Sequence, residues 1–512
     1  MNDGFVLVLD LGTHKCRAVA MDGHGAVAAR ATSPPYPTHR DHPGWAEQEP
    51  EDWWTAAVTC IRELLREVDT GHLLAVIPVG HGPSHLPLDR DGKPLGRSLI
   101  WQDTRARDEA NWISEHTTVE ERFKALGLHL PIAPGMGPAK LLWLRDREPD
   151  RYARTGALVQ PKDYLTLRLT GEVVSDRYGL KDLVHAHTGQ FDPWYADVLG
   201  LRRSLIPRML TPWSLVGKTT EEQARETGLR AGLPVACGTI DAFAGLIGSG
   251  GQNHGEICDV SGTSEIIGVV REAPAQPFEG FLCYPLVHGR SLAFAVTRAA
   301  GDSIDWFVRK IAGASDFGTW ISAFEERAKN DRRCGGPVVF WPYLDGERSP
   351  LWDPDMRGMF CGIDLDTDTD ALVRSVLEGV ALSIRHNLEL LEERTGTKPV
   401  RMWVGGGTAR IALFNQIKAD VTGLDVLVPE EHEATARGAV AMAHVALGRT
   451  PDVLTATRAL LGRPVQISPR AEWKGYYDRL APIYTNLATM MRPIYRELAQ
   501  VRRIMPGPSE VR

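Results

Sequence analysis

Residues 4–22 read GFVLVLDLGTHKCRAVAMD, and residues 255–272 read GEICDVSGTSEIIGVVRE. Each stretch has an apolar run, a short turn that contains Gly-Thr, and a second apolar run. This pattern predicts two strands joined by a tight turn. Because it returns in the second half of the chain, it indicates an internal repeat of one supersecondary unit and a duplicated architecture.

The length of the chain also favours two domains. A chain of 512 residues is too long for a single core, which stops growing well below that size. The stretch GSGGQNHG, at residues 248–255, is the best candidate for the boundary. We therefore expect one domain over residues 1–250, a second over 251–495, and a tail over 496–512.

Composition excludes several classes of protein. The chain is 43% hydrophobic and 24% charged, with a net charge of -7, which is typical of a globular protein without a basic surface for nucleic acid. No apolar run is long enough to cross a membrane, and residues 1–15 do not resemble a signal peptide. The seven cysteines are scattered without a C-x-x-C motif, so we expect reduced thiols and a cytoplasmic location.

The remaining patterns predict an α/β fold. Three strands should form a β-meander at the start of the chain, and residues 50–68 should form a helix that begins at a proline. Residues 117–229 look mostly helical. In residues 371–396 apolar side chains recur at helical spacing.

Three turns combine glycine with hydroxyl residues after a strand. They are Gly12-Thr13-His14-Lys15, Ser261-Gly262-Thr263-Ser264 and Gly405-Gly406-Gly407-Thr408. Glycine lets backbone N–H groups approach an anion closely, and hydroxyl groups add donors. Each turn alone could be an ordinary tight turn, and Lys15 could simply be solvated. Together, with two of them at matching places in the repeat, they indicate a site for the phosphates of a nucleotide.

Asp241 is the only charged residue in the stretch LPVACGTIDAFAGLIGSGG, residues 233–251. An ionised carboxylate in an apolar setting loses hydration and needs compensation. It could cap the helix that follows, or it could be a reactive group near the junction of the two halves. The two interpretations are compatible.

At this point the residues resemble a known family, the FGGY carbohydrate kinases, and most closely its xylulokinases. The resemblance extends over residues 5–492 and rests on segments such as LIWQDTRA, AKLLWLRDREPDRY, PKDYLTLRLTGE, GTIDAFAGLIGSG and VGGGTARIALFNQIKADVTG. It implies two ribonuclease-H-like domains of the actin/hexokinase/Hsp70 ATPase superfamily, with ATP and a sugar meeting in the cleft between them. It also implies ATP-dependent phosphorylation of a sugar or polyol, and the family would suggest a homodimer.

The resemblance assigns roles to individual residues. Asp241 matches the catalytic base and would also face the substrate, and Asp10 is placed to hold Mg²⁺, through water. The first phosphate turn would be Gly12, Thr13, His14 and Lys15; the second would include Gly262 and Thr263; Gly405, Gly406 and Gly407 would form the adenosine-side loop, with Asn415 nearby. The substrate wall would be His81, Trp101, Asp103 and Arg105.

The prediction leaves the identity of the acceptor open. Many xylulokinases have Met-His where this chain has Gly82-Pro83, one residue after His81, and they usually have Asn where Ala242 follows the base. D-Xylulose is therefore the first expectation; a polyol such as erythritol or glycerol, or another ketose, is the alternative. A non-catalytic ATP-binding module is disfavoured, because it would not need a wall that faces a sugar.

Some candidate residues have simpler explanations. Asp103 and Arg105 could form a surface ion pair, and His81 or His85 could be plain loop histidines. His185 and His187 could suggest a metal, but no carboxylate or cysteine lies at ligand spacing, so a metal site there is not expected.

Overall fold

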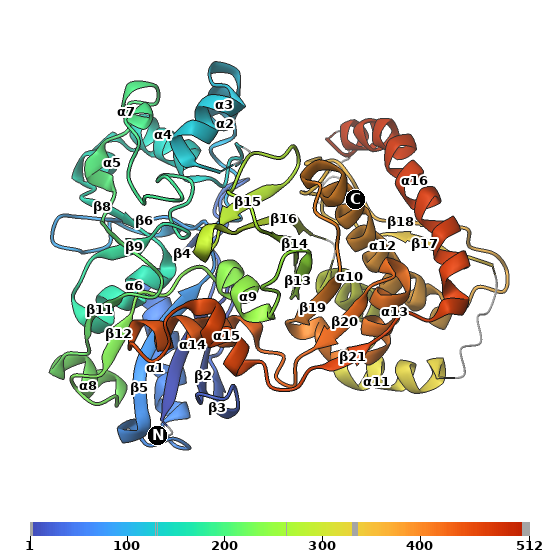
Figure 1. The fold of residues 1–512 in the computed structure, drawn as a ribbon. Coiled ribbons are helices and arrows are strands. Elements are labelled where there is room, and N and C mark those ends of the chain that lie inside the picture. Colours follow the sequence, from blue (N-terminus) through green and yellow to red (C-terminus); the bar gives the residue numbers. More distant parts are fainter. Residues whose placement is uncertain are drawn as a thin grey trace, which may run out of the picture.

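The computed structural model describes residues 4–503, except 129, 131, 263, 299 and 330–335. Two halves, each built around one sheet, lie side by side (Figure 1). The first sheet has the strand order β11-β12-β5-β1-β2-β3. Its strands are β1 (Phe5–Leu11), β2 (Cys16–Met21), β3 (Val27–Thr32), β5 (Leu73–Gly80), β11 (Leu215–Lys218) and β12 (Pro234–Ala236).

The second sheet has the order β15-β16-β14-β13-β19-β20-β21. Its strands are β13 (Glu256–Ser261), β14 (Glu265–Arg271), β15 (Leu282–Pro285), β16 (Ser291–Thr297), β19 (Arg401–Gly405), β20 (Asp425–Val428) and β21 (Val465–Ile467).

The two sheets share one topology, which confirms the predicted repeat. In the first, β3, β2 and β1 are antiparallel neighbours, and β1, β5 and β12 are parallel. In the second, β16, β14 and β13 are antiparallel, and β13, β19 and β20 are parallel. The turns after β1 and β13 are therefore equivalent, and so are the loops after β5 and β19.

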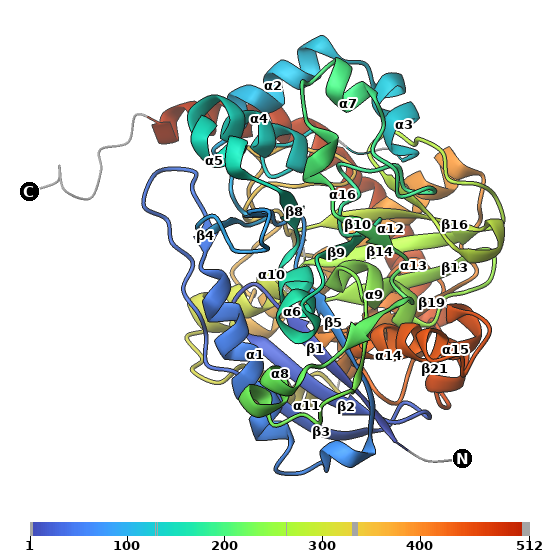
Figure 2. The same cartoon turned by 90° about the vertical axis from the view of Figure 1, so that its left-hand side faces the viewer.

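Both faces of the first sheet are buried, which explains why residues 5–9 are continuously apolar. Leu7 and Leu9 face a core shared with α1 (Pro50–Leu64) and α6 (Pro161–Thr170). Val6 and Val8 point to the opposite face, toward α9 (Asp241–Ser249) and α14 (Ala434–Ala446). Figure 2 shows α1 lying across β1, β2 and β3. The helix predicted over residues 50–68 ends at Leu64.

The two halves meet at a pair of equivalent helices. α9 follows β12, α14 follows β20, and the two pack closely together. A Cβ on Gly248 would lie 1.9 Å from the carbonyl oxygen of Ala434, and one on Gly438 would lie 1.9 Å from that of Ala244. Glycine at both positions lets the helix backbones touch. Although α14 and α15 (Val453–Leu460) come late in the chain, they lie beside the first sheet (Figure 1).

The region between β5 and β12 carries helices and short strand pairs. The helices are α2 (Arg107–His116), α3 (Val119–Leu126), α4 (Gly137–Arg147), α5 (Pro149–Arg154), α7 (Trp194–Asp197) and α8 (Glu221–Thr227). The strand pairs are β6 (Leu86–Leu88) with β8 (Ala157–Val159), β9 (Val174–Asp176) with β10 (Arg208–Leu210), and β7 (Ser98–Leu99) with β4 (Glu47–Gln48), which precedes α1.

Long helices flank the second sheet. The helix expected at 371–396 is α12 (Thr369–Thr395), and α13 (Ala412–Thr422) packs against it. The other elements of this half are α10 (Gly301–Trp306), α11 (Phe317–Ala328), α16 (Ala471–Arg503), and the pair β17 (Val339–Trp341) and β18 (Met359–Cys361). α16 passes through residue 495, so the boundary expected there falls inside a helix. Among the described helices, none is both long and apolar enough to cross a bilayer.

Candidate functional site

The first phosphate turn, residues 12–15, joins β1 to β2. It is closed by the Gly12 N–H, which donates to the carbonyl oxygen of Lys15 over 3.0 Å. The Tyr36 hydroxyl donates to the Gly12 carbonyl, and Gln48 Nε2 donates to the Thr13 carbonyl over 2.7 Å. Trp101 Nε1 donates to Thr13 Oγ1 over 2.9 Å. The Thr13 hydroxyl therefore keeps its own proton for a ligand.

The second and third glycine turns touch one another. Gly406 has φ +86°, and a Cβ there would lie 2.4 Å from the carbonyl oxygen of Ser261 at the end of β13. Gly301, the first residue of α10, donates its N–H to the Gly262 carbonyl over 3.0 Å. Thr263 lies outside the described residues. The loop after β19, the turn after β13 and the start of α10 thus form one assembly.

This assembly leaves space and polar atoms for a ligand. A Cβ on Gly262 or Gly407 would meet no described atom within 4 Å. Asn415 Nδ2 donates to the Ala409 carbonyl over 2.8 Å. The Oδ1 atom of Asn415 and the Oγ1 atom of Thr408 are buried without a hydrogen-bond partner among the described residues. Gly405, in contrast, packs tightly, since its Cβ would lie 2.7 Å from that of Ala434.

The first turn faces the second half of the chain. Arg17, just beyond it, lies 2.5 Å from Asp10 Oδ2 and 3.6 Å from Glu433 at the start of α14. His14 lies within electrostatic reach of Asp302 in α10: burial raises the pKa of Asp302, and His14 partly offsets that rise. The structure therefore brings the three predicted turns to the junction of the halves.

Asp241 is the first residue of α9 rather than its N-cap, which is Ile240. Its Oδ1 accepts from the N–H of Ala242 over 2.6 Å, so capping of the usual kind does not occupy the carboxylate. Burial raises the pKa of Asp241 to about 7, and the negative charge of Asp10 adds to that rise. Lys181 and Arg17 oppose it. Asp241 and Asp10 thus influence one another at the junction.

His81 lies beneath the first turn. Its backbone N–H donates to the Leu11 carbonyl over 2.9 Å, and the Nδ1 atom of its ring lies 2.9 Å from Ser84 Oγ. The side chain is 3% exposed, and its Nε2 has no partner in the described part of the chain. Burial lowers the pKa of His81 to about 3, so the imidazole is neutral. His81 is therefore buried, and its contact with a substrate stays a prediction.

Trp101 contacts both the first phosphate turn and the second half of the chain. Its backbone N–H donates to Ser84 Oγ over 3.1 Å, and the Arg348 guanidinium lies 5.2 Å from the centre of its ring. Arg348 belongs to the loop between β17 and β18. Trp101 therefore connects the predicted substrate wall to the phosphate turn and to the opposite half.

Asp103 and Arg105 do not form a surface ion pair: they are buried, and that alternative is wrong. Arg105 Nη2 lies 2.8 Å from Asp103 and 2.8 Å from Glu47, and its guanidinium stacks 3.6 Å from the ring of Trp45. Asp103 also accepts from the N–H of Ala46 over 2.7 Å. The pair fixes the loop that carries Trp101, and its contact with a substrate stays a prediction.

Several residues near the predicted site were not predicted from the sequence. They are Lys181, Asp176, Gly301 and Arg348. Lys181 stands beside Asp182 in the stretch YGLKDLV, so its sequence signal is weaker than that of Asp241, which has no charged neighbour. The His185 and His187 rings lie 5.6 Å apart, and no group of metal-ligating side chains occurs in the described residues.

These features define an α/β protein with two equivalent halves that present glycine turns and a carboxylate to one junction. Models of the FGGY family of carbohydrate kinases match both halves: the N-terminal domain matches residues 5–248 and the C-terminal domain matches 259–447. The chain belongs to this family. It is an ATP-dependent carbohydrate kinase with the actin/hexokinase/Hsp70 ATPase fold.

Individual relatives carry different substrate names. A xylulose kinase of Bacillus subtilis is 26% identical over 98% of this chain and 99% of its own length. A gluconokinase of the same organism is 25% identical over 98% of both chains. The solved structure of a ligand-bound xylulose kinase from Lactobacillus acidophilus has a TM-score of 0.85 at 21% identity, covering 96% of this chain and 99% of that one. The family relationship is thus clear, but the acceptor in the names of these relatives differs.

Proposed function

We propose that the chain transfers the γ-phosphate of ATP to a hydroxyl of a small open-chain sugar, with D-xylulose as the first candidate. The observation that carries this proposal is the hydrogen bond between Trp101 and Thr13, because it joins the predicted acceptor wall to the first phosphate turn. Asp241 lies at the same junction, within electrostatic reach of Asp10.

In this proposal Asp241 acts as the base. The acceptor oxygen forms a bond to the γ-phosphorus, the bond from that phosphorus to ADP breaks, and the hydroxyl proton passes to Asp241. Such a transfer needs mainly positioning and neutralisation of charge around a loose transition state. A carboxylate whose pKa lies near 7 is suited to accept a proton at neutral pH.

The nucleotide side fits ATP. Open space at Gly262 and Gly407, the hydroxyl of Thr13, and the unpartnered oxygens of Asn415 and Thr408 support a phosphate and adenosine site there. Backbone N–H groups of residues 13–15 would neutralise phosphate charge. His14, Lys15, Thr263, Gly405 and Gly406 remain predicted members of this site.

Asp10 fits a magnesium ion that ATP brings with it. It is 6% exposed, its Oδ2 pairs with Arg17, and its Oδ1 makes no hydrogen bond to any residue that the structure describes. Mg²⁺ is usually held by one or two carboxylates and completed by phosphate oxygens and water. Asp10 would supply one such oxygen, and the ion would neutralise charge on the phosphates.

On the acceptor side we propose direct contact with Trp101 and His81, while Asp103 and Arg105 hold the wall in place. A Cβ on Gly82 would lie 2.7 Å from Cγ2 of Ile240, the residue before Asp241. The position where the chain departs from many xylulokinases therefore packs against the residue that precedes the base. A polyol or another ketose is for this reason kept as the alternative acceptor.

We further propose that residues 1–250 supply the acceptor site and the base, and that 251–495 supply most of the nucleotide site. The cytoplasm, where ATP is available, is the proposed location. A homodimer stays a prediction from the family.

The test is a panel assay with MgATP. Release of ADP is measured with D-xylulose, other ketopentoses, erythritol, glycerol, xylitol, D-arabinitol and D-gluconate. D-Xylulose should give the highest kcat/KM. A clear preference for a polyol would overturn the xylulose assignment, and absence of acceptor-dependent ADP release would overturn the proposed function.

A further inference from the structure

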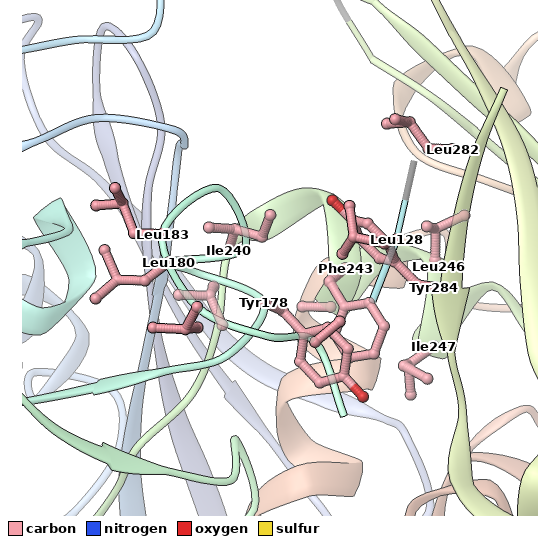
Figure 3. Close-up of a cluster of buried hydrophobic side chains, with 14 of the residues drawn as sticks. Leu128, Tyr178, Leu180, Leu183, Ile240, Phe243, Leu246, Ile247, Leu282 and Tyr284 are labelled. Atoms are coloured by element: carbon pink, nitrogen blue, oxygen red, sulfur yellow. The ribbon is translucent and has the colours of Figure 1, made fainter. Parts of the chain in front are cut away.

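Lys181 and Asp241 are carried by two segments that pack against each other. The residues around Lys181, namely Tyr178, Leu180 and Leu183, lie in the same buried cluster as Ile240 and Phe243, which flank Asp241 (Figure 3). The Tyr178 and Phe243 rings stack with their centres 3.7 Å apart. The two segments therefore pack directly against each other.

One carboxylate anchors both segments. Asp176 Oδ1 accepts from Thr239 Oγ1 over 2.9 Å, just before Asp241, and from the N–H of Tyr178 over 2.9 Å. Asp176 Oδ2 lies 3.0 Å from Lys162 Nζ. Lys162 is therefore the ion-pair partner of Asp176, although the charge of Asp176 also acts on Lys181.

Lys181 itself is left without a partner. Its side chain is 5% exposed, and its ammonium makes no hydrogen bond or ion pair to any residue within the described ranges. At the neighbouring Asp182, Oδ2 lies 3.4 Å from His85 Nε2 and accepts from the N–H of Gly137 over 2.6 Å, whereas Oδ1 has no hydrogen-bond partner among the described residues. A buried charge without a partner is costly, so a partner from outside the chain is expected.

The charged groups near Lys181 show which side chains interact with its ammonium group electrostatically. Asp241 and Asp182 favour its charged form, whereas burial and Arg348 from the opposite half lower its pKa. Lys181 thus lies within electrostatic reach of both Asp241 and Arg348, at the junction of the two halves.

We infer that Lys181 is a specificity-determining residue that binds a ketone or carboxylate oxygen of the acceptor, beside the hydroxyl that faces Asp241. This inference rests on the proposed function and narrows its acceptor class. An ammonium group has donors and no acceptor. A ketone or carboxylate oxygen only accepts and so pairs fully with it. The hydroxyl of a polyol also carries a proton, and that proton would need a separate hydrogen-bond acceptor. Leaving it without one is costly in a buried site.

The experiment compares acceptors that share a carbon skeleton. D-Xylulose is measured against its two reduced forms, xylitol and D-arabinitol, and D-gluconate supplies a carboxylate. The proteins are the unmodified chain, Lys181→Met, Lys181→Arg, and Lys310→Met as a control at an exposed lysine. Initial rates give kcat and KM for each acceptor and for ATP.

The unmodified chain should prefer D-xylulose or D-gluconate over both polyols, and the better of the two tells a ketone from a carboxylate. Lys181→Met should lower kcat/KM for that acceptor about 100-fold, mainly through KM, and remove most of the preference. The KM for ATP and the thermal midpoint should stay near those of Lys310→Met, and Lys181→Arg should recover part of the loss.

Other outcomes would overturn the inference. A polyol preference in the unmodified chain, an unchanged preference in Lys181→Met, or an effect confined to the KM for ATP would each do so while leaving the kinase function intact. No acceptor-dependent ADP release from the unmodified chain would overturn the proposed function and this inference together.

Discussion

Trp101 donates its indole N–H to Thr13 Oγ1 over 2.9 Å, so one side chain connects the predicted substrate wall to the first phosphate turn. Its ring also lies under Arg348 from the opposite half of the chain. A change at Trp101 should therefore affect the two substrates together.

Trp101→Phe keeps a ring for Arg348 and removes only the donor. We expect an approximately fivefold lower kcat/KM for the acceptor together with a higher KM for ATP, because a hydrogen bond of this kind is worth about 1 kcal/mol. Steady-state kinetics with both substrates varied would check this. An effect on the acceptor alone would show that the connection between the two sites has no functional role.

Both the backbone conformation and the neighbouring atoms require glycine at position 406. Gly406→Ala would force a Cβ to within 2.4 Å of the Ser261 carbonyl at φ +86°, so we expect a loss of about 1–3 kcal/mol of stability. The matched control is Gly407→Ala, whose Cβ meets no described atom within 4 Å. Gly407→Ala should keep the thermal midpoint and raise the KM for ATP. Equal thermal midpoints for the two variants would contradict the tight contact between the loop and β13.

His81 should make stability depend on pH. Its pKa is lowered to about 3 in the folded chain, whereas an unfolded histidine has a pKa near 6.5. Below that pH the unfolded state binds the extra proton, so stability falls as pH decreases, by roughly 2 kcal/mol between pH 6.5 and 5. Thermal midpoints over this range should fall less steeply in His81→Gln than in the unmodified chain. The variant at the exposed His24, His24→Gln, should keep the original slope; a parallel slope in His81→Gln would rule out this role.

Much of the fold follows from local sequence pattern. The apolar runs on either side of Gly12 and Gly262 predicted the two hairpins, because strand periodicity and glycine turns are local signals. The equivalence of the two sheets followed from the repeat. The packing of α14 and α15 beside the first sheet did not, since apolar alanines show that a helix is buried and not against which sheet.

The site could be predicted only in part. The three turns and Asp241 are visible as short motifs. The burial of Asp103 and Arg105 depends on Glu47 and Trp45, which are distant in sequence. Lys181 is exceptional because its ammonium forms no ion pair with the carboxylates around it, whereas Lys162 lies 3.0 Å from Asp176 and His85 lies 3.4 Å from Asp182; this arrangement requires the folded chain.

The central claim is that Asp241 accepts the proton of the acceptor hydroxyl. Since burial and Asp10 raise its pKa to about 7, and Lys181 and Arg17 only partly oppose them, kcat/KM should fall as pH decreases through about 7, where the carboxylate becomes protonated. Asp241→Asn removes the base, keeps the shape of the side chain, and should leave binding of ATP nearly unchanged.

The most direct measurement is acceptor-dependent ADP release by Asp241→Asn beside the unmodified chain, with the best acceptor of the panel at saturation and the MgATP concentration varied. We predict that kcat falls at least 100-fold, in line with the usual contribution of general-base catalysis, while the KM for ATP changes little. Full activity of Asp241→Asn would contradict the account.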